Sequence, residues 1–173
     1  LKQVLHDHLE TEARRIPENF NEFCEHTLGL RLTSYQHEAA ELMNKHDFVA
    51  LRWSRQSGKT NLVAAWLLHY ALTHENSQIA VVGPSWRQTK IPVTKINSFL
   101  LRIPKGYYHK FQATIVRLKN GSTIQALPNS PSTIRGFSLS IVFADELNYI
   151  ANDDDLYDAI SFTLATTAGK FIC

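Results

Sequence analysis

The sequence is poor in cysteine, which excludes a secreted scaffold held together by disulfides. Only two cysteines, Cys24 and Cys173, occur in 173 residues, and they lie far apart. A small secreted domain of that kind carries more cysteines, so a reducing cytoplasm is the expected setting. None of the eight histidines stands in a pattern with cysteines that would indicate a zinc site.

Long apolar runs are also missing. A membrane-spanning helix needs about 18 or more consecutive apolar residues, and no such run occurs. No basic segment followed by an apolar run opens the chain, so no secretory signal is expected. The first residue is Leu1 rather than Met, as expected for a fragment or a processed product.

The chain has no strong excess of charge, no internal repeats and no low-complexity linker. Its formal net charge of +2 says little about a nucleic-acid partner, because the placement of basic residues on one face decides such binding. A length of 173 residues, of which 44% are hydrophobic, suits one domain with a sizeable core.

Short apolar runs alternate with helical patterns along the chain. Buried strands are predicted at 48–52, 79–83, 140–143 and 171–173, and helices at 1–15, 35–43, 61–72, 88–101 and 153–164. Ser34 is the expected cap of the second helix. This alternation predicts an α/β fold with a mostly parallel sheet. Asn120-Gly121, between the runs 113–118 and 122–127, predicts a β-hairpin inserted on that plan.

A polar loop, residues 54–60, follows the first strand and opens a helix. It ends in Gly58-Lys59-Thr60, the end of the phosphate-binding motif G-x-x-x-x-G-K-[ST], although Trp53 occupies the first glycine position. In this context backbone N–H groups and the helix dipole face a phosphate. Gly58 would allow close approach of the backbone, Lys59 would neutralise the β- and γ-phosphates, and Thr60 would bind Mg²⁺. The alternative is a chance match at an ordinary helix start.

Two acidic residues, Asp145 and Glu146, follow an apolar strand directly, which is the Walker B pattern. Asp145 would hold Mg²⁺, mostly through water, and Glu146 would polarise the attacking water. The alternative is an acidic helix cap, but α/β proteins bind ligands at the carboxyl end of a strand, where these two acids stand.

The two motifs in this order predict a P-loop ATPase of the class with a catalytic glutamate, the ASCE or RecA-like class. The expected architecture is a three-layer sandwich with a mostly parallel central sheet. In that class the strand after Walker B lies between the P-loop strand and the Walker B strand. Residues 171–173 are therefore expected in the middle of the sheet, beside residues 48–52.

Residues 30 to 173 resemble the ATPase domain of the terminase large subunit, the motor of viral DNA packaging. The loop 54–60 (SRQSGKT) matches that family's variant Walker A, in which Arg-Gln precedes Gly-Lys-Thr. Residues 32–36 (LTSYQ) resemble its adenine-recognising Q motif, and residues 132–137 (STIRGF) resemble a segment just before Walker B. Residues 142–147 (VFADEL) then fit its Walker B.

The resemblance implies further site residues. Arg55 resembles an arginine that acts in cis on the γ-phosphate, with a loop-shaping salt bridge as the alternative. Gln36 would read the adenine edge, or is an exposed helical glutamine, and Tyr35 packs by the base or lies in the core. Arg135 senses the nucleotide or holds the loop near Walker B. The whole loop would bind nucleotide, through Ser54, Arg55, Gln56, Ser57, Gly58, Lys59 and Thr60.

The chain departs from the family pattern after Walker B. Residues 171–173 resemble the start of the strand that carries the family's coupling motif, so residues 31–173 are expected to be an ATPase domain truncated before that motif, with slow hydrolysis. Residues 1–30 are expected to be a peripheral helical segment. No nuclease domain of the family is expected within these residues, and Asp153, Asp154 and Asp155 are expected to form a helix N-terminus rather than its metal cluster.

The function implied by the resemblance is an ATPase that uses ATP and Mg²⁺ to move double-stranded DNA into a viral capsid. The implied partners are DNA, a portal protein, the small terminase subunit and further copies in a ring, in the host cytoplasm and without a membrane. The alternatives are a superfamily 2 helicase-like ATPase, against which Leu147-Asn148 after Asp-Glu argues, and a nucleotide-binding module without turnover. Trp86, Arg87 and Lys90 could face DNA, or form a solvated loop.

Overall fold

The strands of the protein form one six-stranded sheet in a computed structural model that describes residues 15–54, 56–110, 112–151 and 153–173. Its order is β1-β6-β5-β2-β4-β3. All neighbours pair in parallel except β3 and β4. The bounds are β1 Phe48–Val49, β2 Gln78–Val82, β3 Ile115–Arg117, β4 Thr123–Ala126, β5 Ile141–Ala144 and β6 Lys170–Ile172.

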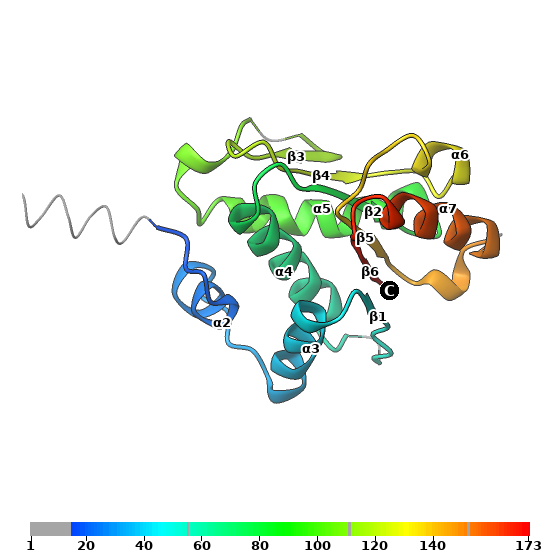
Figure 1. The fold of residues 1–173 in the computed structure, drawn as a ribbon. Helices are drawn as coiled ribbons and strands as arrows, with labels where there is room; N and C mark the ends of the chain where they lie inside the picture. The colour runs from blue at the N-terminus through cyan, green and yellow to red at the C-terminus, as the bar shows by residue number, and fades with distance from the viewer. Residues whose placement is uncertain (1–14, 55, 111, 152) are drawn as a thin grey trace, which may run out of the picture.

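Helices cover both faces of this sheet, which confirms the predicted α/β sandwich (Figure 1). One face carries α3, α4 and α5, and the other carries α6 and α7. The short helices α2 and η1 precede α3, and the short helices η2 and η3 lie between longer elements. The bounds are α2 Phe20–Glu22, η1 Phe23–Thr27, α3 Ser34–Lys45, α4 Lys59–Thr73, α5 Trp86–Leu100, η2 Lys105–Tyr107, α6 Pro131–Ile134, η3 Leu147–Tyr149 and α7 Asp153–Ala165.

Helix α4 is the most deeply buried helix of this arrangement. Nine of its residues, Leu62 to His69 and Ala71, are buried. A helix that is apolar on every side must be covered on every side. The sheet, α3, α5 and residues 16–28 cover it, since all of them belong to one core. The described part of the segment expected to be peripheral therefore contributes to this core through Phe20, Phe23 and Leu28. The helix expected at 1–15 lies outside the described residues, apart from Arg15.

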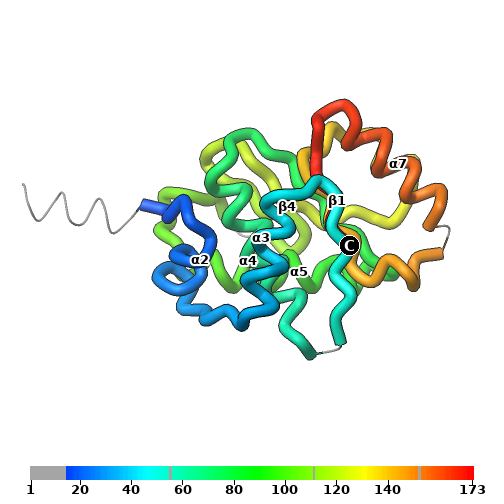
Figure 2. Tube along the Cα trace, turned by 60° about the horizontal axis from the view of Figure 1, so that its bottom comes forward, coloured from blue at the N-terminus to red at the C-terminus, as the bar shows by residue number. Residues whose placement is uncertain are grey.

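Strand β6 lies between β1 and β5, as expected for this class of P-loop protein. Phe171 pairs with Phe48 on one side and with Val142 on the other. Figure 1 and Figure 2 both show the C-terminal end of the chain beside β1. The pairing continues past the short β1, because Leu51 N donates to Cys173 O over 2.6 Å. This register brings the phosphate loop close to the Walker B strand.

The predicted hairpin is present and belongs to the main sheet. Asn120-Gly121 joins β3 to β4, and β4 also pairs in parallel with β2. Gly121 has a φ of +85°, which favours glycine, and a Cβ there would collide with Asn76. The Asn120 amide donates to Ala71 O over 2.8 Å, which attaches the turn to the end of α4.

Two local predictions were wrong in detail. Thr33 rather than Ser34 caps α3, because the Gln36 side chain accepts from Thr33 N and fixes the first turn one residue earlier. Phe48 is 53% exposed, since β1 is an outer strand of the sheet. Helix α5 begins at Trp86, and Pro92 is buried within it.

None of the helices in the described part of the chain combines the length and the apolar character that a membrane crossing needs.

Candidate active site

The phosphate loop joins the end of β1 to the N-terminus of α4. Gly58 caps the helix with a φ of +83°, in the left-handed region that glycine adopts without strain. A Cβ at this position would lie 2.8 Å from Gln36 Nε2, so space also favours glycine. The first N–H groups of α4 have no partner within the helix and point out of its end. The loop therefore presents donors and a positive helix dipole to an anion.

An ion pair joins this loop to the Walker B strand. Lys59 Nζ lies 3.2 Å from Asp145 Oδ1, and the two side chains are 22% and 14% exposed. Strand β5 is buried along its whole length, and Asp145 N donates to Val82 O over 2.9 Å. The backbone of β2 therefore fixes the carboxylate opposite the lysine. The fold brings together two motifs that are far apart in the sequence.

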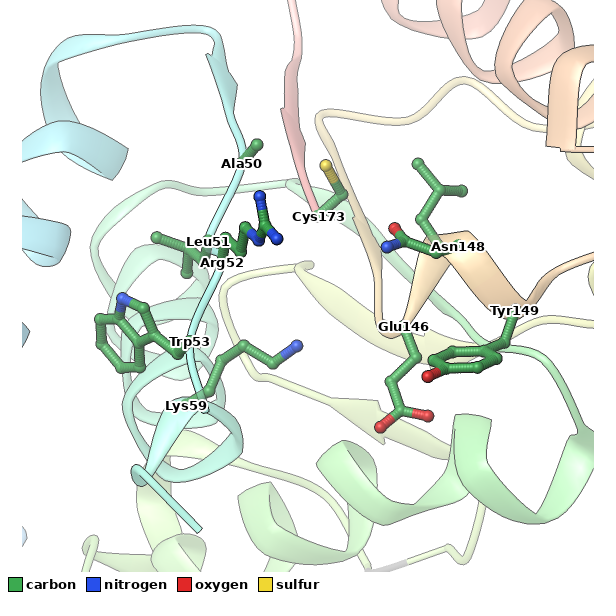
Figure 3. Close-up of a pocket in the computed structure, with 10 residues that line it drawn as sticks. Ala50, Leu51, Arg52, Trp53, Lys59, Glu146, Asn148, Tyr149 and Cys173 are labelled. Carbon is green, nitrogen blue, oxygen red and sulfur yellow. The ribbon is translucent and has the colours of Figure 1, made fainter. Parts of the chain in front are cut away.

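Two adjoining cavities open around this ion pair. One, of about 390 Å³, is lined by Trp53, Ser54, Gln56, Ser57, Gly58, Lys59, Thr60, Asn61, Asp145 and Glu146. The other, of about 370 Å³, lies between the start of the loop and the turn after β5 (Figure 3). Lys59 and Glu146 line both cavities. Burial in the second cavity raises the pKa of the Cys173 thiol above its ordinary value, and the charge of Lys59 offsets only part of this rise.

Glu146 has an unusual backbone conformation. Its φ of +52° and ψ of +46° lie in the left-handed region, which is sparsely populated by residues other than glycine. Such a conformation costs about 1–3 kcal/mol and is typical of functional sites. It turns the chain sharply after β5, and Tyr149 N donates to Glu146 O over 2.9 Å. Figure 3 shows the Glu146 side chain extending from this turn beside the Tyr149 ring.

The chemistry of the site fits a nucleoside triphosphate with a divalent cation. Ser57 Oγ is buried in the loop with no hydrogen-bond partner among the described residues, so it is available to a ligand. Lys59 and the N-terminus of α4 supply positive charge for phosphates. The Thr60 hydroxyl and the Asp145 carboxylate are oxygen ligands of the kind that Mg²⁺ prefers, with phosphate oxygens and water completing its shell.

The residues of the Q motif lie against the phosphate loop. Tyr35 donates its hydroxyl to Ser57 O over 2.9 Å, and its ring meets Trp53 edge-on at 5.0 Å between centroids. Gln36 accepts from Thr33 N over 3.0 Å through its amide oxygen. A third cavity, of about 450 Å³, has Tyr35 and Trp53 in its wall. Tyr35 therefore contacts the loop backbone directly, and Trp53, in place of glycine, provides an apolar partner.

The structure does not bring every predicted residue to this site. Arg135 is exposed at the end of α6 and is not among the residues that line the three cavities. Arg55 lies outside the described residues, so its role stays a prediction from the sequence. Asp153 to Asp155 form the first turn of α7, as expected.

One contact of the site was missed by the sequence analysis. Gln88, in the first turn of α5, donates from Nε2 to Glu146 Oε2 over 3.3 Å. The signal that could have found it is the break Gly83-Pro84-Ser85 after a buried strand, because parallel strands end at one edge of a sheet.

Residues 51–168 match a family model described as "Terminase large subunit, T4likevirus-type, N-terminal". Among solved structures, the chain is similar to the large terminase ATPase domain of Thermus phage P74-26 in a mutant form, with a TM-score of 0.73 and 20% identity over 88% of this chain and 67% of that one. The large terminase of bacteriophage HK97 gives a TM-score of 0.70 and 23% identity over 83% of this chain and 32% of that one.

A third similar structure, the large terminase of a thermophilic bacteriophage in complex with ATP-γ-S, gives a TM-score of 0.63 and 13% identity over 82% of this chain and 37% of that one. At these identities the likeness shows the fold. The chain spans 67% of the Thermus phage ATPase domain and 32% of the HK97 protein.

Proposed function

The chain belongs to the terminase large subunit family, and it has the ATPase fold of that family. From this we propose that it hydrolyses ATP to drive double-stranded DNA into a viral capsid. The observation that carries the proposal is the ion pair between Lys59 of the phosphate loop and Asp145 at the end of β5, with Glu146 in the same cavity. These three residues have the chemistry that phosphoryl transfer needs, namely a phosphate-binding cation, a metal ligand and a base.

In this proposal the triphosphate lies on the loop 54–60. Mg²⁺, held by Thr60 and Asp145, would neutralise charge on the β- and γ-phosphates. Lys59 contributes a point charge to the same phosphates and leaves Asp145 free for the cation. Glu146 accepts a hydrogen bond from the attacking water and orients it toward the γ-phosphate. The sharp turn at Glu146 separates the two carboxylates, so that one serves the metal and the other serves the water.

The further residues of the site remain proposals that the family resemblance supports. Arg55 would stabilise charge on the γ-phosphate in cis, and Gln36 would read the adenine. Arg135, exposed at the end of α6, would act as a nucleotide sensor or hold the loop before Walker B. DNA, a portal protein, the small terminase subunit and a ring of copies in the host cytoplasm are the proposed partners and setting, on the ground of family membership.

The proposed function is tested by combining three measurements on the full-length chain. ATP with Mg²⁺ should bind in a titration, phosphate should be released, and linear double-stranded DNA should stay double-stranded during turnover. Strand separation coupled to hydrolysis would instead identify a helicase. Tight binding of ATP without any release of phosphate, with and without DNA, would identify a nucleotide-binding module.

Tyr35→Phe is expected to weaken the binding of adenine and guanine nucleotides to the same degree. The substitution removes only the hydroxyl that donates to Ser57 O, so it loosens the phosphate loop. One hydrogen bond corresponds to about a 2- to 10-fold loss of affinity. ATP, ADP and GTP affinities, measured by calorimetry, should fall together.

Tyr157→Phe is the matched control for this prediction. Tyr157 lies on α7, and its ring packs on Phe48 and Phe171 away from the loop. Removal of its hydroxyl should leave all three affinities unchanged. A loss in Tyr35→Phe that affects ATP and spares GTP would show that Tyr35 recognises the base instead.

A further inference from the structure

A chain of polar contacts connects the first turn of α5 to Glu146. Ser85 donates its hydroxyl to Gln88 Oε1 over 2.8 Å, and Gln88 donates from Nε2 to Glu146 Oε2 over 3.3 Å. The Ser85 contact occupies the oxygen of the amide, so the NH₂ group faces the carboxylate. Among the described residues, Gln88 is the one hydrogen-bond partner of the Glu146 carboxylate.

The sheet fixes the distance between the two turns that carry these polar contacts. Strands β2 and β5 are parallel neighbours, and Val82 pairs with Ala144 at their carboxyl ends. The turn after β2 therefore lies beside Asp145-Glu146. The turn itself is tightly packed, because a Cβ on the buried Gly83 would lie 3.3 Å from Thr89, whose hydroxyl donates to Ser85 O over 3.0 Å. Figure 3 shows the Glu146 carboxylate extending toward the green helix α5.

We propose that Gln88 is a positioning residue for Glu146, an inference that rests on the proposed ATP hydrolysis. The Glu146 backbone is fixed by its own turn, but a glutamate side chain rotates about several bonds, and an unrestrained carboxylate would spend little time aligned with the water. The amide N–H of Gln88 holds one carboxylate oxygen of Glu146, which lines the cavity, and leaves the other oxygen for the attacking water. Alignment of a base within about 0.5 Å is what productive geometry requires.

The side chain of Gln88 is not needed to hold the local structure together. The cap of α5 does not need the Gln88 side chain, because Ser85 Oγ accepts from Gln88 N over 3.3 Å through the backbone. Removing the amide should therefore leave the helix and the phosphate loop in place. The effect should appear in the rate of the chemical step and not in nucleotide binding.

Gln88→Ala in the full-length chain is expected to lower kcat for ATP hydrolysis about 10- to 100-fold, the equivalent of one hydrogen bond to a charged group. KM and the melting temperature should stay close to those of the unchanged protein. Gln88→Glu has almost the same shape but places a carboxylate against Glu146, so its kcat should fall further. Gln112→Ala, which removes the same amide from an exposed loop, is the control and should change nothing.

The decisive measurement repeats Gln88→Ala in a Glu146→Gln background under single-turnover conditions. A residue that acts through Glu146 should cause no further loss once the carboxylate is gone. An additive loss, or a change in KM or melting temperature that accounts for the loss of kcat, would show a structural role and overturn the inference. Normal turnover in Gln88→Ala would overturn the inference about Gln88 and leave the proposed function standing. Absence of hydrolysis by the unchanged protein would overturn both.

Discussion

Glu146→Gln is expected to stop steady-state ATP hydrolysis while leaving ATP affinity close to that of the unchanged protein. The substitution keeps the size of the side chain and can keep the contact with Gln88, but it removes the carboxylate that we propose accepts a hydrogen bond from the attacking water. Loss of a general base lowers a rate by about 10²–10⁴. The charge on Lys59 and the Asp145 carboxylate, the proposed metal ligand, are untouched, so the triphosphate should still bind.

Asp145→Asn is the comparison that gives this result its meaning. It removes the proposed metal ligand and leaves Lys59 without its anionic partner, so it should weaken binding of ATP in the presence of Mg²⁺ and have less effect when EDTA is present. Phosphate release and calorimetric titration, with and without EDTA, measure both quantities. Small and equal effects of the two substitutions would contradict the separate roles of the two carboxylates.

The strand order was predictable because it follows from two kinds of local pattern. Buried apolar runs gave the strands, and the phosphate loop with Asp145-Glu146 identified the class of P-loop protein that places residues 171–173 beside β1. The class also explains why Lys59 meets Asp145, since the carboxyl ends of parallel strands share one edge of the sheet. The apolar runs and the two P-loop motifs were therefore enough to predict the strand order and the proximity of Lys59 and Asp145.

The wrong local predictions have a common physical cause. The cap of α3 depends on which side chain folds back, and the Gln36 amide, three residues on, selects Thr33 over Ser34. Phe48 was expected to be buried from its own apolar run, yet its exposure is decided by whether another strand lies beside β1. Both outcomes depend on residues outside the short sequence pattern, so the pattern alone could not predict them.

Gln88 and the backbone of Glu146 could not be read from the sequence for a related reason. A glutamine in the first turn of a helix is ordinary, and only the register between Val82 and Ala144 places it against the turn at Glu146. The left-handed conformation of Glu146 contradicts its local preference, as is expected where function rather than stability selects the backbone. Position in the sheet, more than residue type, underlies the roles proposed for both residues.

Lys59→Ala is expected to remove most of the affinity for the triphosphate. An ammonium group that donates to two phosphates contributes at least two hydrogen bonds to charged groups, roughly 3 kcal/mol or more, which is about a 100-fold or greater loss of affinity. The fold itself should survive, because the helix cap at Gly58 and the core beneath α4 do not involve this side chain. Calorimetric titration with ATP and Mg²⁺ measures the loss.

Lys170 provides a matched control within the same sheet. Its Nζ lies 3.4 Å from Asp47 Oδ1 and also donates to His46 O over 2.9 Å, and its side chain is 16% exposed against 22% for Lys59. It stands at the opposite end of the parallel strands, where β6 begins, so Lys170→Ala should lower the melting temperature and leave ATP affinity unchanged. If both substitutions weakened ATP binding equally, the loss would come from general destabilisation. Unchanged affinity in Lys59→Ala would place the nucleotide elsewhere, because the cation that lies against Asp145 would then not be the one that binds the phosphates.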